Sequence, residues 1–208
     1  MSWVEDAMQV ARPGDVVFLA IPNFLYRRVA RASGTWTSHV GFVDGVDDQG
    51  RATVAESRVP RASRTSLRKF LGRTEPGLAA IRRLPTPPTP AQIATLRSAA
   101  ERRFGTLYHL GFDYDSQRTY CSKFVHDVFS EALGVSLGEI EAFRTLLERH
   151  PDQPLTFWRL WYFGRIPWNR RTVTPVSLLE SPRLVTVWEG GRVSAFANPL
   201  ATSELQTP

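Results

Sequence analysis

The chain has little cysteine and little lysine: Cys121 is its one cysteine, and Lys69 and Lys123 are its two lysines. A single cysteine excludes an internal disulfide, so the fold must be stabilised by packing. With 208 residues, 42% of them hydrophobic, the chain can bury a sizeable core without a structural metal. We expect one domain over residues 1–197, followed by a polar, disordered tail at 198–208.

Long apolar runs are also missing. The longest one, residues 16–21, is far too short to span a bilayer. The first residues include Glu5 and Asp6 and no apolar run of signal-peptide length. Together with the lone cysteine, these features predict a cytoplasmic protein.

The scarcity of lysine affects how the positive charge is interpreted. The formal net charge is +6, yet 24 of the 26 basic residues are arginines, once the two lysines are subtracted. The arginines are scattered along the chain, which indicates a solvated surface and no nucleic-acid partner. An anionic partner stays open as the alternative.

The hydrophobic pattern predicts an α+β fold. Strands are expected at residues 16–21, 38–44, 52–57, 78–84, 184–188 and 193–196. Helices are expected at residues 23–33, 90–104, 121–133, 139–149 and 154–163. Pro90 suits the first turn of its helix, and Gly134 suits the end of the helix that begins at Cys121.

Cys121 stands at the start of an amphipathic helix, where the positive end of the helix dipole favours a thiolate. The dipole contributes roughly 0.3–1 kcal/mol, and one pKa unit corresponds to about 1.36 kcal/mol. The dipole alone therefore shifts the thiol pKa by less than one unit. A reactive cysteine would need a cationic partner as well, usually histidine. The alternative is that Cys121 is a small buried hydrophobe.

Four histidines compete for this role. His126 lies roughly 140° around the helix from Cys121, and His150 lies in a helix-ending segment before Pro151. His109 precedes the helix in a loop and could reach the cysteine. His39 begins a strand, beside small residues and facing away from its apolar neighbours, which favours it over His109.

A third group would have to orient the histidine. Glu56 ends the strand expected to pair with that of His39, and it shares a face with Val54. The alternative is a solvated glutamate paired with Arg58.

Four segments together resemble a known family. They are residues 14–18 (GDVVF), 38–41 (SHVG), 54–57 (VAES) and 120–125 (YCSKFV). The residues of these segments and their order along the chain resemble those of permuted papain-like, NlpC-type cysteine hydrolases of the YiiX and YebB kind. YebB-like proteins are the nearer match. Later segments, among them residues 108–112 and 166–168, fit the same likeness, which covers residues 10 to 190.

The resemblance implies a central antiparallel sheet packed against helices, with the nucleophile at a helix N-terminus. It makes Cys121 the nucleophile, His39 the general base and Glu56 the orienting group. Tyr120 and Ser122, beside the cysteine, become candidate oxyanion or substrate-binding residues, with plain packing as the alternative for Tyr120. No metal or organic cofactor is implied, and the oligomeric state is not predicted.

The expected function is a cysteine hydrolase that attacks an amide or peptide carbonyl through an acyl-enzyme. One alternative is a lipid acyl hydrolase or acyltransferase with the same Cys-His site, and another is a non-catalytic ligand-binding module. The aromatic segment 157–168 bears on this choice, because it is either a packing helix or a wall that contacts lipid or a membrane surface. Redox sensing by Cys121 would need an intermolecular partner.

Overall fold

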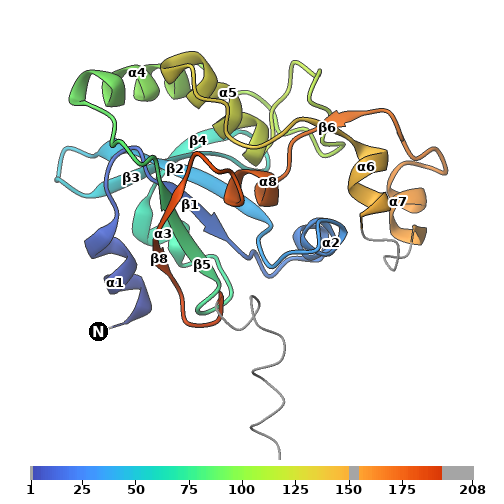
Figure 1. The fold of residues 1–208 in the computed structure, drawn as a ribbon, viewed down its shortest axis with the longest axis horizontal. Coiled ribbons are helices and arrows are strands. Elements are labelled where there is room, and N and C mark those ends of the chain that lie inside the picture. The colour runs from blue at the N-terminus through green and yellow to red at the C-terminus, as the bar shows by residue number, and fades with distance from the viewer. Residues whose placement is uncertain (1, 150–154, 194–208) are drawn as a thin grey trace, which may run out of the picture.

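The computed structural model describes residues 2–149 and 155–193 of the chain (Figure 1). Eight helices and eight strands occur in these ranges. The helices are α1 (Trp3–Val10), α2 (Phe24–Ala32), α3 (Leu67–Leu71), α4 (Pro90–Glu101), α5 (Cys121–Leu133), α6 (Phe143–Glu148), α7 (Thr156–Trp161) and α8 (Pro175–Leu179). The strands are β1 (Val16–Leu19), β2 (His39–Val46), β3 (Ala52–Ser57), β4 (Ala62–Ser66), β5 (Ala79–Arg83), β6 (Glu141–Ala142), β7 (Arg171–Thr172) and β8 (Val185–Glu189).

Six of these strands form one antiparallel sheet, in the order β4-β3-β2-β1-β5-β8. Strand β1 is central and buried on both faces, which explains its continuous apolar sequence. Val16 and Phe18 join the core beneath α4 and α5, whereas Val17 and Leu19 join the core beneath α1 and α3. The predicted α+β fold, with a central antiparallel sheet packed against helices, is confirmed (Figure 1).

Helix α5 runs across the sheet and carries the cysteine at its first residue. Its inward face, including Phe124, Val125 and Val128, is fully buried against the sheet. Gly134 ends the helix in the left-handed region, with φ 66°, where a Cβ atom would be strained. Burial along this face fixes the position of the helix, and therefore of Cys121, relative to strands β2 and β3.

Several sequence-based expectations differ from the structure. The helix expected at 139–149 is instead the short strand β6 followed by α6, because β6 pairs with β7. Helices α1, α3 and α8 and strand β4 were not expected, since each is short and depends on tertiary contacts. Residues 194–196 of the last expected strand, and the expected tail at 198–208, lie outside the described residues.

Candidate active site

Cys121 lies at the point where α5 meets the beginning of β2. Its side chain is 3% exposed and lines a pocket. The backbone N–H of Val40, one residue after the start of β2, interacts with its sulfur. Tyr120 makes no side-chain capping bond at the start of this helix, so side chains do not cap its first N–H groups. An oxygen anion placed here would lie near the sulfur of Cys121 and near N–H groups that the side chain of Tyr120 does not cap.

His39 is held by Glu56 on the neighbouring strand. The Nε2 atom of His39 lies 2.7 Å from the Oε2 atom of Glu56, and both side chains are buried. The other ring nitrogen, Nδ1, has no partner among the nitrogen and oxygen atoms of the described residues. It is therefore the atom left to interact with the thiol of Cys121. The structure thus brings together the three residues that the sequence singled out, Cys121, His39 and Glu56, and their catalytic roles stay a prediction.

Electrostatics favour an ion pair between cysteine and histidine. Burial alone would lower the pKa of His39, but hydrogen bonding with Cys121 and Glu56 outweighs burial and raises it to about 9. Burial would raise the pKa of Cys121, but the interaction with His39 outweighs it, so the thiol pKa falls below its usual value. Thiolate and imidazolium stabilise each other, so the interaction favours the charged form of both groups.

Glu56 is itself fixed by an arginine that sequence reasoning missed. The Nη2 atom of Arg73 donates to both carboxylate oxygens, at 2.8 and 2.9 Å. Arg58, the partner considered from sequence, is farther away, with its Nε 3.8 Å from Oε1. Burial would raise the pKa of Glu56, but His39 and Arg73 outweigh it and lower the pKa, so the group is a carboxylate. Nothing in the sequence spacing points to Arg73, which follows α3.

Two tyrosines cover the sulfur. The hydroxyl of Tyr108 donates toward the Sγ atom of Cys121 over 3.9 Å. Burial and the neighbouring thiolate raise the pKa of Tyr108, so its phenol keeps the proton that it donates. Tyr26, on α2, interacts with the hydroxyl of Tyr108, and its ring meets that of His39 edge-on at 5.7 Å. Tyr108 belongs to a segment that carries the family resemblance, whereas no sequence signal marks Tyr26.

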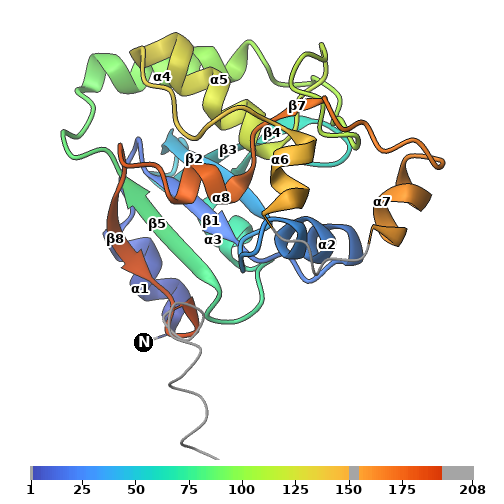
Figure 2. The ribbon, with the colours of Figure 1, turned by 45° about the vertical axis from the view of Figure 1, so that its right-hand side comes forward.

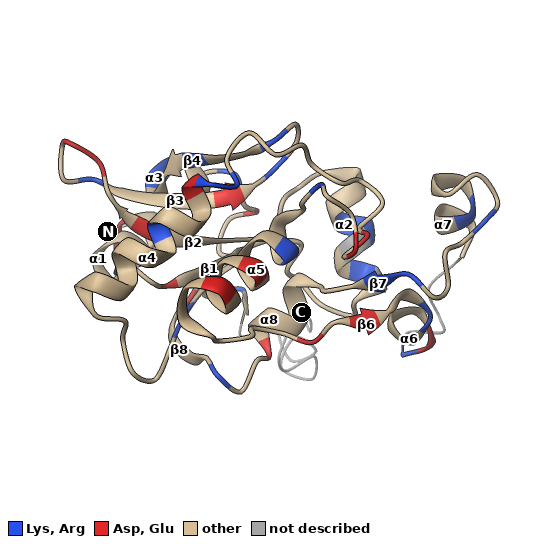
Figure 3. Ribbon diagram, turned by 90° about the horizontal axis from the view of Figure 1, so that it is seen from above, with Lys and Arg blue, Asp and Glu red and all other residues tan. Residues whose placement is uncertain are grey.

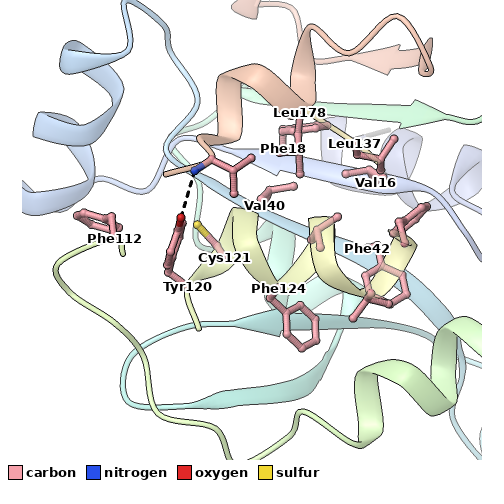
Figure 4. Close-up of a cluster of buried hydrophobic side chains, with 14 of the residues drawn as sticks. Val16, Phe18, Val40, Phe42, Phe112, Tyr120, Cys121, Phe124, Leu137 and Leu178 are labelled. Carbon is pink, nitrogen blue, oxygen red and sulfur yellow. Dashed lines mark hydrogen bonds between the residues drawn. The ribbon is translucent and has the colours of Figure 1, made fainter. Parts of the chain in front are cut away.

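Tyr120 and Ser122 bind the segment that contains β7. The backbone N–H of Val173 donates to the hydroxyl of Tyr120 over 3.1 Å, as Figure 4 shows beside the sulfur of Cys121. The hydroxyl of Ser122 donates to the carbonyl of Val173 over 2.8 Å. Both hydroxyls thus have partners within the protein, and both residues line the pocket. A role for either residue in binding an oxyanion or substrate stays a prediction.

The other histidines have different partners. The Nδ1 atom of His109 accepts hydrogen bonds from the backbone N–H groups of Gly111 and Asp113. His126 lies 2.7 Å from the carbonyl of Leu137 through Nδ1, as its position around the helix predicted. His150 lies outside the described residues. The described part of the chain therefore brings one histidine, His39, to the cysteine.

The pocket beside Cys121 is apolar. The space in it that a water molecule can reach is about 30 Å³, and no charged side chain lines it. Its aromatic and aliphatic lining includes Phe112, Phe143, Leu146 and Trp158. Within the segment 157–168, Trp158 is thus a buried pocket residue. Such a lining suits an uncharged acyl group next to the nucleophile.

The sheet, the helix-borne cysteine and the histidine that precedes it in sequence define a papain-like cysteine protein in permuted order. The chain belongs to the Peptidase_C92 family, the permuted papain-like amidase enzymes of the YaeF/YiiX type, whose model matches residues 10–188. Two comparisons agree with this assignment. The chain is 27% identical to the uncharacterized protein YiiX of Escherichia coli K12 over 174 residues, which is 84% of each protein.

A crystal structure of YiiX from Escherichia coli O157:H7, described as a metalloprotein, shares the fold. It superposes with a TM-score of 0.75 at 24% identity and covers 86% of this chain and 97% of its own. The expected nearer likeness to YebB-like proteins stays a prediction. Residues 2–149 and 155–193 contain no group of three or more His, Cys, Asp or Glu side chains that could hold a metal ion. The donors in these described ranges thus do not fit a metal site.

Proposed function

We propose that this protein is a cysteine amidase that works through an acyl-enzyme. The arrangement that carries the proposal is the buried Glu56–His39 hydrogen bond beside a cysteine of lowered thiol pKa. The family supports a cysteine hydrolase of the amidase type. As part of the same proposal we keep the cytoplasmic location, where a lone cysteine stays reduced.

The proposed reaction has two steps. The thiolate of Cys121 attacks the carbonyl carbon, and the negative charge moves to the carbonyl oxygen near the first N–H groups of α5. The imidazolium of His39 then gives its proton to the leaving amine as the C–N bond breaks, which leaves a thioester. In the second step, neutral His39 takes a proton from water, the hydroxide displaces the thiolate, and the carboxylic acid leaves.

The apolar pocket favours a second candidate substrate, a lipid acyl ester or amide. Because no charged side chain lines this pocket, an aliphatic acyl group would fit it better than a charged peptide segment. The same thioester could then pass to water or to another acyl acceptor. A non-catalytic binding module is the third possibility, and it would have no need of the lowered thiol pKa.

Labelling with an acyl-cysteine-reactive probe tests the proposal. We expect the wild-type protein to be labelled at Cys121 near pH 7, Cys121→Ala not to be labelled, and His39→Ala to be labelled much more slowly. His109→Ala is the matched control, since this neighbouring histidine contacts backbone groups. Mass spectrometry of trapped acyl groups would separate peptide from lipid substrates. Equal labelling of wild type and His39→Ala would overturn the proposed pair.

A further inference from the structure

The most exposed large apolar side chains gather on two helices. Among the described residues, Phe163 is 95% exposed, Leu160 74% and Phe24 64%, more than any other large hydrophobic residue. Leu160 and Trp161 follow Phe157 in α7 by three and four residues, so both lie near Phe157 on the helix surface. Trp158 points the other way and is buried. Helix α7 therefore buries Trp158, keeps Phe157 and Trp161 partly buried against the core, and exposes Leu160.

Contacts join these side chains into one surface. The rings of Phe24 and Phe157 meet edge-on at 5.6 Å, and those of Phe157 and Trp161 stack at 5.7 Å. The indole of Trp161 donates to the carbonyl of Leu110 over 3.0 Å, and Leu110 is also exposed. Figure 2 shows α7 at the edge of the molecule beyond α2. We name this surface the α2–α7 face, formed by Phe24, Leu110, Phe157, Leu160, Trp161 and Phe163.

Phe163 closes the C-terminus of α7: its N–H donates to the carbonyl of Leu160, and the N–H of Gly164 donates to the carbonyl of Arg159. The φ of Phe163 is 50°, in the left-handed region that bulky side chains avoid. The ring that is held in this conformation is almost fully exposed. The backbone is thus explained by the end of the helix, whereas the exposed apolar ring indicates a surface that a partner covers.

The two chain segments that supply most of this face are basic. Residues 21–43 and 155–179 contain no aspartate or glutamate, and they contain seven arginines. Of these arginines, Arg27 pairs with Glu75, and Arg170 and Arg171 pair with Asp113 and Asp115. The remaining four, Arg28, Arg31, Arg159 and Arg165, form no ion pair with any described residue. Figure 3 shows the basic positions on α2 and α7.

Arg28 links the charge to the apolar surface. Its guanidinium lies over the rings of Phe24 and Phe157, 5.1 and 5.5 Å from their centroids. The apolar side chains can enter the region between head groups and acyl chains, while the arginines stay at the level of the phosphates. We propose that the α2–α7 face docks this protein onto an anionic lipid membrane surface.

The charge pattern favours lipid over a protein partner, because a sheet of anionic head groups can pair with scattered arginines at any spacing. The proposal does not depend on the catalytic one, although the two fit together. Tyr26 of α2 and Trp158 of α7 line the pocket beside Cys121. Docking through these helices would place the pocket next to the membrane, which contains acyl lipids.

Vesicle co-sedimentation tests the proposal with the full chain. Vesicles of phosphatidylcholine alone are compared with vesicles that contain about one third phosphatidylglycerol, at low and high salt. We expect binding at least about tenfold stronger to the anionic vesicles, weakened by salt. If the wild-type protein binds both vesicle types equally, or binds neither, that result alone overturns the proposal.

Matched variants locate the surface. Phe24→Ser/Leu160→Ser/Phe163→Ser should weaken anionic binding by about tenfold or more. Val46→Ser/Val59→Ser/Val185→Ser, which also removes three exposed apolar side chains, should not weaken it. Arg31→Gln/Arg159→Gln should weaken binding more than Lys69→Gln/Arg183→Gln. The membrane proposal is wrong if the first triple variant binds vesicles like the wild type. It is also wrong if the wild-type protein does not bind vesicles but forms dimers that this triple variant abolishes.

Discussion

The buried end of β2 and the α2–α7 face differ in how completely their polar and charged groups are partnered. At the first, Glu56 has two partners at hydrogen-bond distance, and each partner is held in turn. At the second, four arginines lack ion pairs within the described chain, and apolar rings are exposed. Buried groups that hydrogen-bond to one another keep one arrangement and suit chemistry, whereas a surface of exposed rings and unpaired arginines suits association. The following substitutions should separate the two regions.

The largest effect is expected for His39→Ala. Without the imidazolium the thiol loses the cation that lowers its pKa, and the leaving group loses its proton donor. We expect kcat/KM to fall by roughly 10²–10⁴-fold, with anionic vesicle binding unchanged. Steady-state kinetics on the substrate found by acyl trapping, together with co-sedimentation, measures both. A loss of vesicle binding would show that the two regions are not independent.

Glu56→Gln should move the pH profile. His39 has a pKa of about 9, partly through its hydrogen bond to the Glu56 carboxylate. Activity needs imidazolium, so kcat/KM of the wild type should fall as pH rises through about 9. A neutral amide stabilises imidazolium less, so the His39 pKa drops and this basic limb moves to lower pH. Profiles of kcat/KM against pH check the sign, and an unmoved basic limb would contradict the role of Glu56.

Gly41→Ala should destabilise the fold near the site. A Cβ atom here would lie 2.8 Å from Cγ1 of Val54 and 3.0 Å from Cε2 of Phe70. We expect a loss of about 1–3 kcal/mol in the free energy of unfolding, as for overpacking elsewhere. Gly191→Ala is the control, because a Cβ there meets nothing within 4 Å. Denaturant unfolding of both variants measures the difference, and equal stabilities would contradict close packing at Gly41.

Phe163→Ser should have the smallest effect on stability. The ring is 95% exposed, so its removal should change the free energy of unfolding by less than about 0.5 kcal/mol. The same denaturant measurement applies, with vesicle binding as the second readout. A large destabilisation would mean that the α2–α7 face contributes to folding.

Sequence reasoning found the parts of the site that local patterns reveal. Gly134 and the apolar period define the helix of Cys121, and His39 begins a strand, which made both residues candidates. The family resemblance then favoured them over a buried cysteine and over His109. Glu56 followed from strand pairing, since the registers of β2 and β3 place it near His39. Arg73, Tyr26 and Tyr108 reach the site through tertiary packing, and no spacing marks them. Short elements such as β4 and α3 were not predicted, because they too depend on tertiary packing.

Sequence also underestimated how unevenly charge is distributed. The arginines were expected to be a solvated surface, yet Arg83 forms a buried pair with Asp15, and Arg64 bridges Asp44 and Glu101. Composition cannot tell such paired arginines from unpaired ones. Among the described residues no helix is long and apolar enough to cross a membrane.

The hydrogen bond between Tyr120 and Val173 links the start of α5 to the wall of the pocket. One end of this bond belongs to the residue before Cys121, and the other to a residue of the pocket wall. A ligand that pushes this wall outward must also pull on the start of α5. Attempts to broaden the range of acyl groups by enlarging the wall should therefore slow acylation even for small substrates, so selectivity and speed would have to be engineered together.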